Sequence, residues 1–553
     1  MKPCFRLGIV IAMGVVSMSS HAAPSSSEDM RDRLQNERLQ REQRRLDDAV
    51  LPGDIDSPQQ GEAIPSSDGP CFDITSLSII SLGKENQYLL RALQTQLPDG
   101  GCYDVAAIQT LQRRLSNWLT RHGYVTSRVL LPEQTLASGQ LKLVLVAGHI
   151  DDVHADGLSE KLARMALPNK EGALVNLRDL EQGIENLNRV QGVDASFDLA
   201  PGKEMGDTRI DVKGTRSRPV RASLLVDETQ YGSHVHGTAR VMAEIGSPSG
   251  FTDRLIIAAN TDLDQEVSDT AWGGSIDYDI GVGYWLFAAN SSYHAYRNDV
   301  QGVNQTFEAS GVTQNSRVDV SRVVQRSNVQ RVTLGGYVGY SDIRNLLDSG
   351  TISVSSYDLR MAAVRFDFTR LWRRYQFAST VTLEQAKASG PATNLPNGLV
   401  VADEEHLRAL FYSSALRTFS FLRSSVQWRL NGQYSNDVLF SAERFSVTAL
   451  VRGYDDIGVG GNSGLTSTFE YSINPILGNG AVAVRPYIAT DIGWVPGNEN
   501  EFGFVRLASA TLGTALSYRS VGGAFEISSP IKGISTQDSG NDYVVQLNIS
   551  VAY

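Results

Sequence analysis

Long apolar runs and clustered positive charge are both missing from most of this chain. Beyond the first 22 residues no run of 18 apolar residues occurs, which argues against a membrane-spanning α-helix. The net charge is −11 and the basic residues form no patch, which argues against a nucleic-acid partner. Membrane-spanning strands stay possible, because they alternate apolar and polar residues and leave the mean hydropathy unremarkable. The 50 glycines and 20 tyrosines favour that possibility.

The N-terminus has the pattern of a secretory signal peptide over residues 1–22. A basic start precedes an apolar run from Leu7 to Val16, and small residues surround Ala22. An N-terminal membrane anchor is the alternative, but the apolar run is too short to cross a bilayer. We therefore expect an exported protein that is cleaved after Ala22.

Cysteine is scarce, with three residues in 553. Cleavage of the signal would remove Cys4 and leave Cys71 and Cys102, an even pair in an oxidising compartment. No cluster of cysteine or histidine accompanies the pair, so we predict a disulfide rather than a metal site. A closed loop of about 31 residues would stabilise a small module by about 3–4 kcal/mol.

The composition of residues 23–48 predicts a polar helix. Good helix formers dominate this segment, and the polarity is interrupted only by Met30, Leu34, Leu39 and Leu46. Such a helix bridges solvent or lies in a polar cavity, and about 24 residues would measure about 36 Å, enough to cross a membrane-sized lumen. A solvated charged tail is the alternative. Residues 49–70 are rich in Pro, Gly and Ser and are expected to be a linker.

An internal repeat of about 75 residues follows, with units expected at 71–147 and 148–217. The first unit has an alternating stretch at 72–82, two stretches of helical spacing and two further strands. Its second helical stretch carries apolar residues every three or four positions, namely Val105, Ile108, Leu111, Leu115 and Leu119. The second unit repeats the order strand, helix, helix, strand, strand. This order predicts two small α+β domains.

Residues 218–553 contain no convincing long helix and predict antiparallel strands. The last strand places apolar residues on one face: Tyr543, Val545, Leu547, Ile549, Val551 and Tyr553. Aromatic residues stand at both ends of that face, as at two membrane interfaces, whereas a soluble sandwich needs no such ends. About 336 residues divided among 16 strands leave about 21 for each strand and connection, which suits a closed outer-membrane barrel.

The order of these segments resembles the transporters of two-partner secretion, the haemolysin-secretion and filamentous-haemagglutinin exporter family. "VRGYDD" at 451–456 resembles the tip of the family's sixth extracellular loop, which folds back into the lumen. "YIATDIGWV" at 487–495 resembles the aspartate-x-glycine strand motif, here Asp491 and Gly493. "DETQYGSHVHGTAR" at 227–240 resembles the start of the barrel.

The resemblance implies an outer-membrane transmembrane β-barrel of 16 antiparallel strands, two periplasmic α+β POTRA domains and an N-terminal plug helix. The barrel would occupy the outer membrane of a Gram-negative bacterium. Many such barrels end in Phe, whereas this chain ends in Tyr553, which keeps an aromatic ring as the C-terminal barrel signal.

The resemblance also implies a contact between the loop tip and the barrel wall. Strand parity puts Ile488, Thr490, Ile492 and Trp494 on a face suited to lipid, so Asp491 points into the lumen. The resemblance implies that Arg452 binds this carboxylate through its guanidinium fork. Within the motif Val451, Arg452, Gly453 and Tyr454, the glycine would let the tip turn closely and the tyrosine would pack beside it. In a wet lumen such a pair contributes about 1–3 kcal/mol, and two unrelated charges are the alternative.

Two other patterns resemble functional sites but fail on spacing. "GVGGNSG" at 458–464 matches neither the nucleotide-binding loops nor the G-x-S-x-G nucleophile, so loop flexibility explains it better. His234 and His236 share a strand face but have no third ligand nearby in sequence. We therefore expect no catalytic residue, no metal and no cofactor, and we do not expect an enzyme.

The function implied by the resemblance is an outer-membrane pore that recognises a cognate unfolded exoprotein in the periplasm and exports it without ATP. The POTRA domains would bind this cargo partly by adding its strand to a sheet edge. The expected partners are a large β-helical adhesin, haemolysin or toxin, the barrel-assembly machinery during biogenesis, and membrane lipids. A barrel-assembly insertase and a passive porin are the alternatives. A porin has no use for the N-terminal repeat, and the two repeats and polar helix argue against an insertase.

Overall fold

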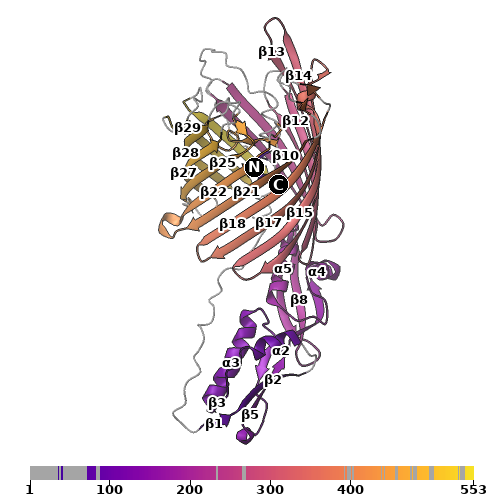
Figure 1. Ribbon diagram of the computed structural model, residues 1–553, viewed down its shortest axis with the longest axis vertical. Coiled ribbons are helices and arrows are strands. Elements are labelled where there is room, and N and C mark those ends of the chain that lie inside the picture. Colours follow the sequence, from indigo (N-terminus) through magenta and orange to yellow (C-terminus); the bar gives the residue numbers. More distant parts are fainter. Residues whose placement is uncertain are drawn as a thin grey trace, which may run out of the picture.

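A computed structural model describes two small α+β domains that hang below a large barrel (Figure 1). It describes residues 71–553, with gaps, and the helical residues Gln35, Asn36, Leu39 and Gln40. The gaps are 83–86, 232–233, 264–269, 391–392, 395–399, 402–403, 438, 441–442, 455–458, 474–475, 478–481, 497–503, 533–534 and 536–541. The predicted signal peptide at 1–22, the linker at 49–70 and most of the polar segment at 23–48 lie outside the described residues.

The first α+β domain has a three-stranded sheet in the order β2-β5-β4 and a separate pair, β1 with β3. Its elements are β1 (Phe72–Ile74), β2 (Ser76–Leu82), α2 (Gln87–Gln94), β3 (Gly101–Tyr103), α3 (Val105–Arg121), β4 (Arg128–Leu130), the 3₁₀ turn η1 (Leu136–Ser138) and β5 (Gln140–Val146). Four of the five apolar residues predicted to line α3 are fully buried, but Val105 is 59% exposed. Val105 is the first residue of the helix, directly after the N-cap Asp104, so it precedes the turns that pack against the sheet.

The alternating stretch at 72–82 is predicted to form one strand, and this prediction is wrong. The stretch forms two strands in different sheets. The break lies at Thr75, where the amides of Thr75 and Ser76 both donate to the carbonyl of Gly139, at 2.8 and 3.1 Å. β1 then pairs with β3, whereas β2 runs parallel to β5. Periodicity cannot reveal this break, because the acceptor lies far along the chain.

A disulfide joins Cys71 to Cys102, with Cα atoms 5.4 Å apart. Cys71 directly precedes β1, and Cys102 lies in β3 opposite Asp73, so the bond ties this short sheet together. We expect peptide mapping without reductant to recover the linked peptides. We expect Cys71→Ser with Cys102→Ser to lower the domain's free energy of unfolding by about 3 kcal/mol, because the unfolded chain gains freedom. Two free thiols in the mature outer-membrane protein would contradict the bond.

The second α+β domain has the predicted order of elements and a sheet in the order β6-β8-β7. Its elements are β6 (His149–Asp156), α4 (Glu160–Ala166), α5 (Leu177–Asn188), β7 (Val193–Pro201) and β8 (Asp207–Arg216). β6 and β8 are parallel, β7 is antiparallel to β8, and the two helices enclose an apolar core with the sheet.

Sixteen long antiparallel strands form a closed barrel, as predicted. They are β9 (Val220–Tyr231), β10 (His234–Gly246), β11 (Asp253–Asp262), β12 (Thr270–Val282), β13 (Trp285–Gln301), β14 (Thr306–Arg326), β15 (Gln330–Leu347), β17 (Tyr357–Trp372), β18 (Tyr375–Ser389), β21 (Glu404–Thr418), β22 (Ser424–Tyr434), β25 (Gly464–Ile473), β27 (Val482–Val495), β28 (Val505–Tyr518), β29 (Val521–Pro530) and β30 (Val544–Ala552). The last strand closes on the first, with Asn548 opposite Asp227.

Short elements lie between these strands. They are β16 (Gly350–Thr351), β19 (Thr393–Asn394), β20 (Val400–Val401), β23 (Phe445–Ser446), β24 (Gly460–Gly461), β26 (Ile476–Leu477) and the 3₁₀ turns η2 (Ser353–Ser355) and η3 (Phe421–Arg423). In the described part of the chain, no helix is long and apolar enough to span a membrane.

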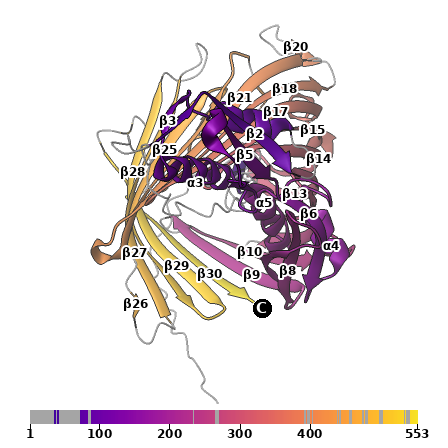
Figure 2. The same cartoon turned by 90° about the horizontal axis from the view of Figure 1, so that it is seen from below.

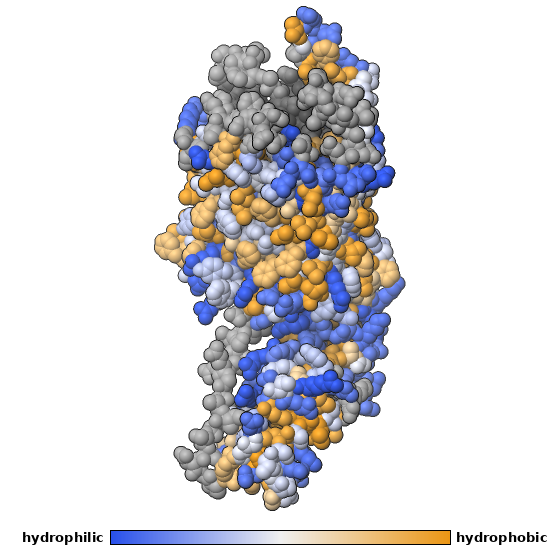
Figure 3. All heavy atoms as spheres, in the orientation of Figure 1, coloured by the Kyte–Doolittle hydropathy of each residue, from blue (hydrophilic) through white to orange (hydrophobic). Residues whose placement is uncertain are grey.

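Apolar side chains cover the outer wall of the barrel, and polar ones line its interior. In β30, Leu547, Ile549 and Val551 are exposed to the outside, as the alternation predicts. Figure 3 shows many apolar residues across the wall between more polar ends. The same parity leaves Asp491 only 1% exposed on the inner face of β27.

The second α+β domain contacts the adjacent end of the barrel through α5, at the turns that join β12 to β13 and β14 to β15. Arg326, at the end of β14, is hydrogen-bonded to Gln182 and Glu185 at 2.9 and 2.5 Å. Arg331, at the start of β15, also binds Glu185. Tyr284, in the turn before β13, donates to Asp179, whose pKa is raised by burial although this hydrogen bond opposes the rise. Figure 2 shows the two domains beneath one side of the ring of strands.

Candidate functional site

The chain between β22 and β25 folds into the barrel and packs against its inner wall. Apolar residues of this segment, Phe445, Val447, Val451 and Tyr454, form a buried cluster with Val495 of β27 and Val505 and Leu507 of β28. β23 and β24 pair within the segment, with Phe445 opposite Gly461. We call the described residues between 435 and 463 the lumen loop. Its burial against two strands means that the loop tip has one defined position.

Arg452 is the charged group at the tip of the lumen loop, and it binds two carboxylates of the wall. Its Nε donates to Asp491 Oδ2 at 2.8 Å and its Nη2 to Asp491 Oδ1 at 3.1 Å, which is a bidentate fork. Its Nη1 lies 3.4 Å from Glu526 Oε2 on β29. The side chain of Arg452 is 21% exposed and that of Asp491 only 1%, so the pair is shielded from most water.

Glu526 was not among the residues predicted for this site. It accepts a hydrogen bond from the Tyr487 hydroxyl at 2.6 Å, in addition to its contact with Arg452. Ser509 also donates to Asp491 Oδ2, at 3.4 Å. The inward parity of β29 marks Glu526 as a lumen residue, but no local motif connects it to Arg452.

Two glycines allow the loop to approach the wall. A Cβ atom at Gly493 would lie 2.3 Å from Val447 Cγ1 and 2.7 Å from Val451 Cγ2, so any larger residue would push the loop away. Gly453 has φ of +87°, a conformation that side chains disfavour. Tyr454 follows and is 3% exposed, with its hydroxyl donating to the carbonyl of Ala508 at 2.8 Å. Asp455 and Asp456 of the motif lie outside the described residues.

A second anchor holds the beginning of the lumen loop at Glu443. His406 Nε2 lies 2.7 Å from Glu443 Oε1, and Arg408 Nη1 donates to the backbone carbonyl of Glu443 at 3.0 Å. Arg408 Nε also donates to Glu384 Oε1 at 2.5 Å. All four side chains are less than 9% exposed, so charges of both signs are paired out of water. Sequence reasoning missed this anchor, because its members come from three separate segments.

The described residues of the polar N-terminal segment also lie inside the barrel. Gln35 exchanges two hydrogen bonds with the backbone of Ser446, at 2.9 and 2.8 Å. Gln40 accepts from Arg240 of β10 at 3.2 Å, and Leu39 packs against Ala378 and Tyr412. These contacts connect the segment to the lumen loop and to opposite parts of the wall.

The remaining sequence candidates have structural contacts or lie apart from the lumen loop. Ser463 exchanges hydrogen bonds with the backbone of Ser435, both at 3.0 Å, which joins the two ends of the loop. His234 and His236 lie in β10. Tyr553 pairs with Ala222 of β9 through its backbone, with its amide donating at 2.8 Å. Among the residues that the structure describes, no cluster of three or more His, Cys, Asp or Glu could hold a metal.

Family models match most of the described chain. The model described as haemolysin secretion/activation protein ShlB/FhaC/HecB matches residues 206–516. A POTRA domain of the ShlB type matches residues 85–148, and a second POTRA domain matches residues 149–201.

Characterised relatives agree with these matches. The outer membrane transporter CdiB of Escherichia coli is 25% identical over 543 residues, which cover 94% of this chain and 89% of CdiB. The hemolysin transporter protein ShlB of Serratia marcescens is 24% identical over 511 residues, covering 91% of this chain and 88% of ShlB. The solved structure of CdiB from Escherichia coli has a TM-score of 0.84 at 22% identity, covering 97% of this chain and 100% of that structure, and so has the same fold.

The molecule is thus a barrel transporter of the outer membrane that carries two POTRA domains in the periplasm. The chain belongs to the haemolysin secretion/activation family of ShlB, FhaC and HecB, whose members export proteins by two-partner secretion. It is a pore for the export of an exoprotein.

Proposed function

We propose that export requires the lumen loop to be docked in the barrel when cargo arrives, and requires the loop and the N-terminal helical segment to leave their positions as the cargo passes. The observation that carries this proposal is the bidentate contact of Arg452 with Asp491, supported by Glu526. The contact can hold the loop and still release it, because a charge-assisted pair with a partly exposed guanidinium contributes about 1–3 kcal/mol. We assign no catalytic residue, and folding of the cargo outside the cell supplies the direction of transport.

The lumen loop can be locked to test this function. Val447→Cys with Gly493→Cys should form a disulfide, because a Cβ at Gly493 lies 2.3 Å from a methyl of Val447 that the substitution removes. We expect secretion of the cognate exoprotein to stop under oxidising conditions and to return after reduction. The same double variant under reducing conditions is the control, because Gly493→Cys alone already crowds Val451. Normal secretion through a fully cross-linked barrel would contradict a moving loop.

The POTRA domains are proposed to receive the cargo. β7 is an edge strand of the sheet β6-β8-β7, and β2 and β4 are edges of the sheet β2-β5-β4. An extended segment can pair with such an edge through its backbone. The proposed cargo is a large β-helical adhesin, haemolysin or toxin, and the fragment 24–215 should bind its N-terminal part in a pull-down. The C-terminal strand with Tyr553 is proposed to be recognised by the barrel-assembly machinery.

We propose that the polar segment at 23–48 plugs the resting barrel and that the chain at 49–70 tethers it. Gln35 bonds to the lumen loop and Gln40 to the opposite wall, so the segment occupies space that ions would use. Deletion of 24–48 should raise single-channel conductance in planar bilayers several-fold and leave secretion possible. Gln35→Ala should have a smaller effect of the same sign. Unchanged conductance after deletion would place the segment elsewhere.

A further inference from the structure

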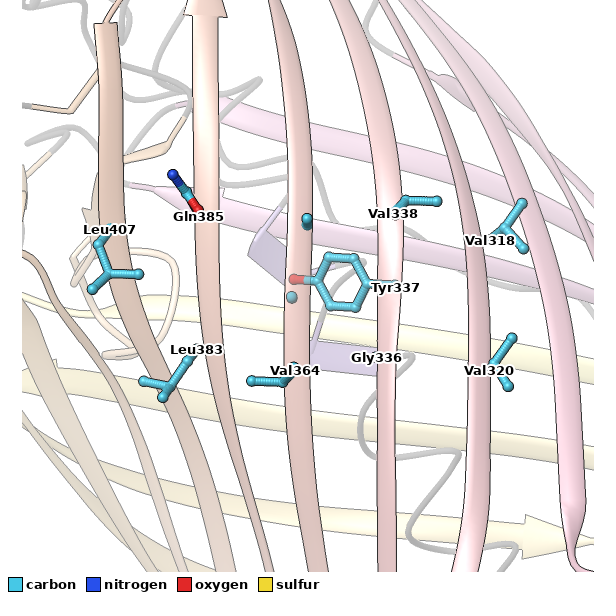
Figure 4. A pocket seen from close by; sticks show the side chains of 11 residues that line it. Val318, Val320, Gly336, Tyr337, Val338, Val364, Leu383, Gln385 and Leu407 are labelled. Atoms are coloured by element: carbon cyan, nitrogen blue, oxygen red, sulfur yellow. The ribbon is translucent and has the colours of Figure 1, made fainter.

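An apolar hollow of about 600 Å³ lies on the outer wall of the barrel, where it faces the membrane (Figure 4). It crosses β14, β15, β17, β18 and β21, and its outward lining residues are Val318, Val320, Gly336, Val338, Ala362, Val364, Leu383, Gln385 and Leu407. The hollow reaches the backbone at Gly336, because this residue has no side chain. The neighbouring strand β17 also lies too close for a side chain there. A Cβ there would lie 2.5 Å from the carbonyl oxygen of Ala363.

A row of polar residues borders one side of this hollow. Tyr340, Arg360, Lys387 and Glu405 are direct partners across β15, β17, β18 and β21. The next row, two residues along each strand, is Val338, Ala362, Gln385 and Leu407 at the edge of the hollow. A molecule with a charged head group and apolar tails could thus place its head group on the polar row and its tails in the adjacent hollow.

Arg360 and Lys387 place two positive charges side by side, which destabilises a sheet unless an anion is present. Lys387 lies 3.4 Å from Glu405, but both side chains are about half exposed, at 46% and 58%. Arg360 forms no ion pair with another described residue. The acids beyond it, Asp342 and Asp358, are both bound by Arg344 at 3.0 Å.

The charged row lies at the end of the membrane belt that is distal to the POTRA domains. Arg331 of β15 binds Glu185 of the second POTRA domain, and Tyr340 follows nine residues later on the same strand. Nine residues of strand extend about 30 Å, and at a tilt of about 40° they rise about 23 Å, which is close to the height of about 25 Å of the apolar band of an outer-membrane barrel. The row therefore borders the outer leaflet.

We propose that this wall is a binding site for the phosphorylated glycolipid of the outer leaflet. Arg360 and Lys387 bind a phosphate of its head group, and the hollow below them takes its acyl chains. The hollow crosses five strands, or about 19 Å at 4.8 Å per spacing, which is wide enough for several chains side by side. A glycolipid with many acyl chains fills this width better than a two-chain phospholipid.

Native mass spectrometry of the full-length protein in detergent can measure this binding. The probes are bisphosphorylated hexa-acyl lipid A, the same lipid without its phosphates, and phosphatidylglycerol, each added at equal concentration. We expect the wild type to retain bisphosphorylated lipid A preferentially. Arg360→Gln with Lys387→Gln should lower its retention about thirtyfold, because each basic group near an anionic surface contributes about 1 kcal/mol to binding. Ala362→Phe, which fills the hollow without changing charge, should also lower it.

Arg370→Gln is the matched control, since Arg370 lies on the same exposed face of β17 near its opposite end. It should leave lipid A retention unchanged, and heat-modifiable mobility on gels should show that every variant is a folded barrel. Equal retention of the lipid without phosphates, equal retention of phosphatidylglycerol, or normal lipid A binding by the double variant would each overturn the proposal.

Discussion

Arg452→Ala should abolish most secretion while leaving a folded barrel in the outer membrane. The arginine lies in a loop and takes no part in strand pairing, so the wall does not need it. Asp491 is 1% exposed, and without the guanidinium it loses its two hydrogen bonds to Arg452. A loss of about 2 kcal/mol shifts the ratio of docked to undocked loop about thirtyfold. Secreted cargo should be measured at matched barrel levels.

Asp491→Ala should also lower secretion sharply, and the two losses should not add. Each substitution removes the same contact, so the double variant should secrete about as poorly as either single variant. Arg485→Ala is the matched control. Arg485 lies on β27, the strand that carries Asp491, and binds the buried Glu470 at 3.0 Å. It forms no hydrogen bond or ion pair with the described residues of the lumen loop. Multiplicative losses, or an equal loss in the control, would show that the contact is not what positions the loop.

Glu526 should make the loss of secretion in Asp491→Ala smaller than the loss in Arg452→Ala. Its carboxylate lies 3.4 Å from Arg452 and accepts from Tyr487, so it can partly hold the arginine when Asp491 is gone. Asp491→Ala should therefore be somewhat milder than Arg452→Ala. Glu526→Gln in the Asp491→Ala background should remove that difference.

Alternation was enough to predict the barrel, since one face of each strand meets lipid and the other meets the lumen. In β27 this parity placed Asp491 inside without any structural information, because the period of a strand is two residues. The partner of Asp491 could not be found in that way. A loop has no period, so the contact with Arg452 came from resemblance, and the contacts of Glu526 and Glu443 could not be predicted.

The first POTRA domain shows the same limit at a smaller scale. The helix α3 was predicted from its apolar spacing, and Asp104 caps it through a 2.7 Å hydrogen bond from Ala107. The three residues of β3 are too few to show a period, yet they pair with β1 and carry Cys102. Short strands are specified by their partners rather than by their own sequence.

Arg408→Ala should destabilise the barrel and loosen the start of the lumen loop. Arg408 is 7% exposed and binds the carboxylate of Glu384 and the backbone of Glu443. Removing one partner of a buried ionic cluster leaves the others uncompensated and costs about 3 kcal/mol. We expect a lower unfolding temperature of the purified barrel and more frequent channel openings in planar bilayers. Arg429→Ala is the control, because its partner Glu470 keeps Arg485.

Arg408→Ala lowers stability both by leaving the Glu384 carboxylate without its guanidinium and by removing packing. These two causes can be separated by also neutralising Glu384. Glu384 is 2% exposed and is also bound by the Tyr337 hydroxyl, so a neutral amide can keep a partner there. Glu384→Gln with Arg408→Gln should thus recover part of the stability that Arg408→Ala loses, since no buried charge remains at that position. The channel should still open more often, because the Glu443 carbonyl has lost its guanidinium donor, although it keeps the hydrogen bond from Gln433 at 2.8 Å. If stability and channel closure instead recovered together, the second anchor would act on the wall and not on the loop.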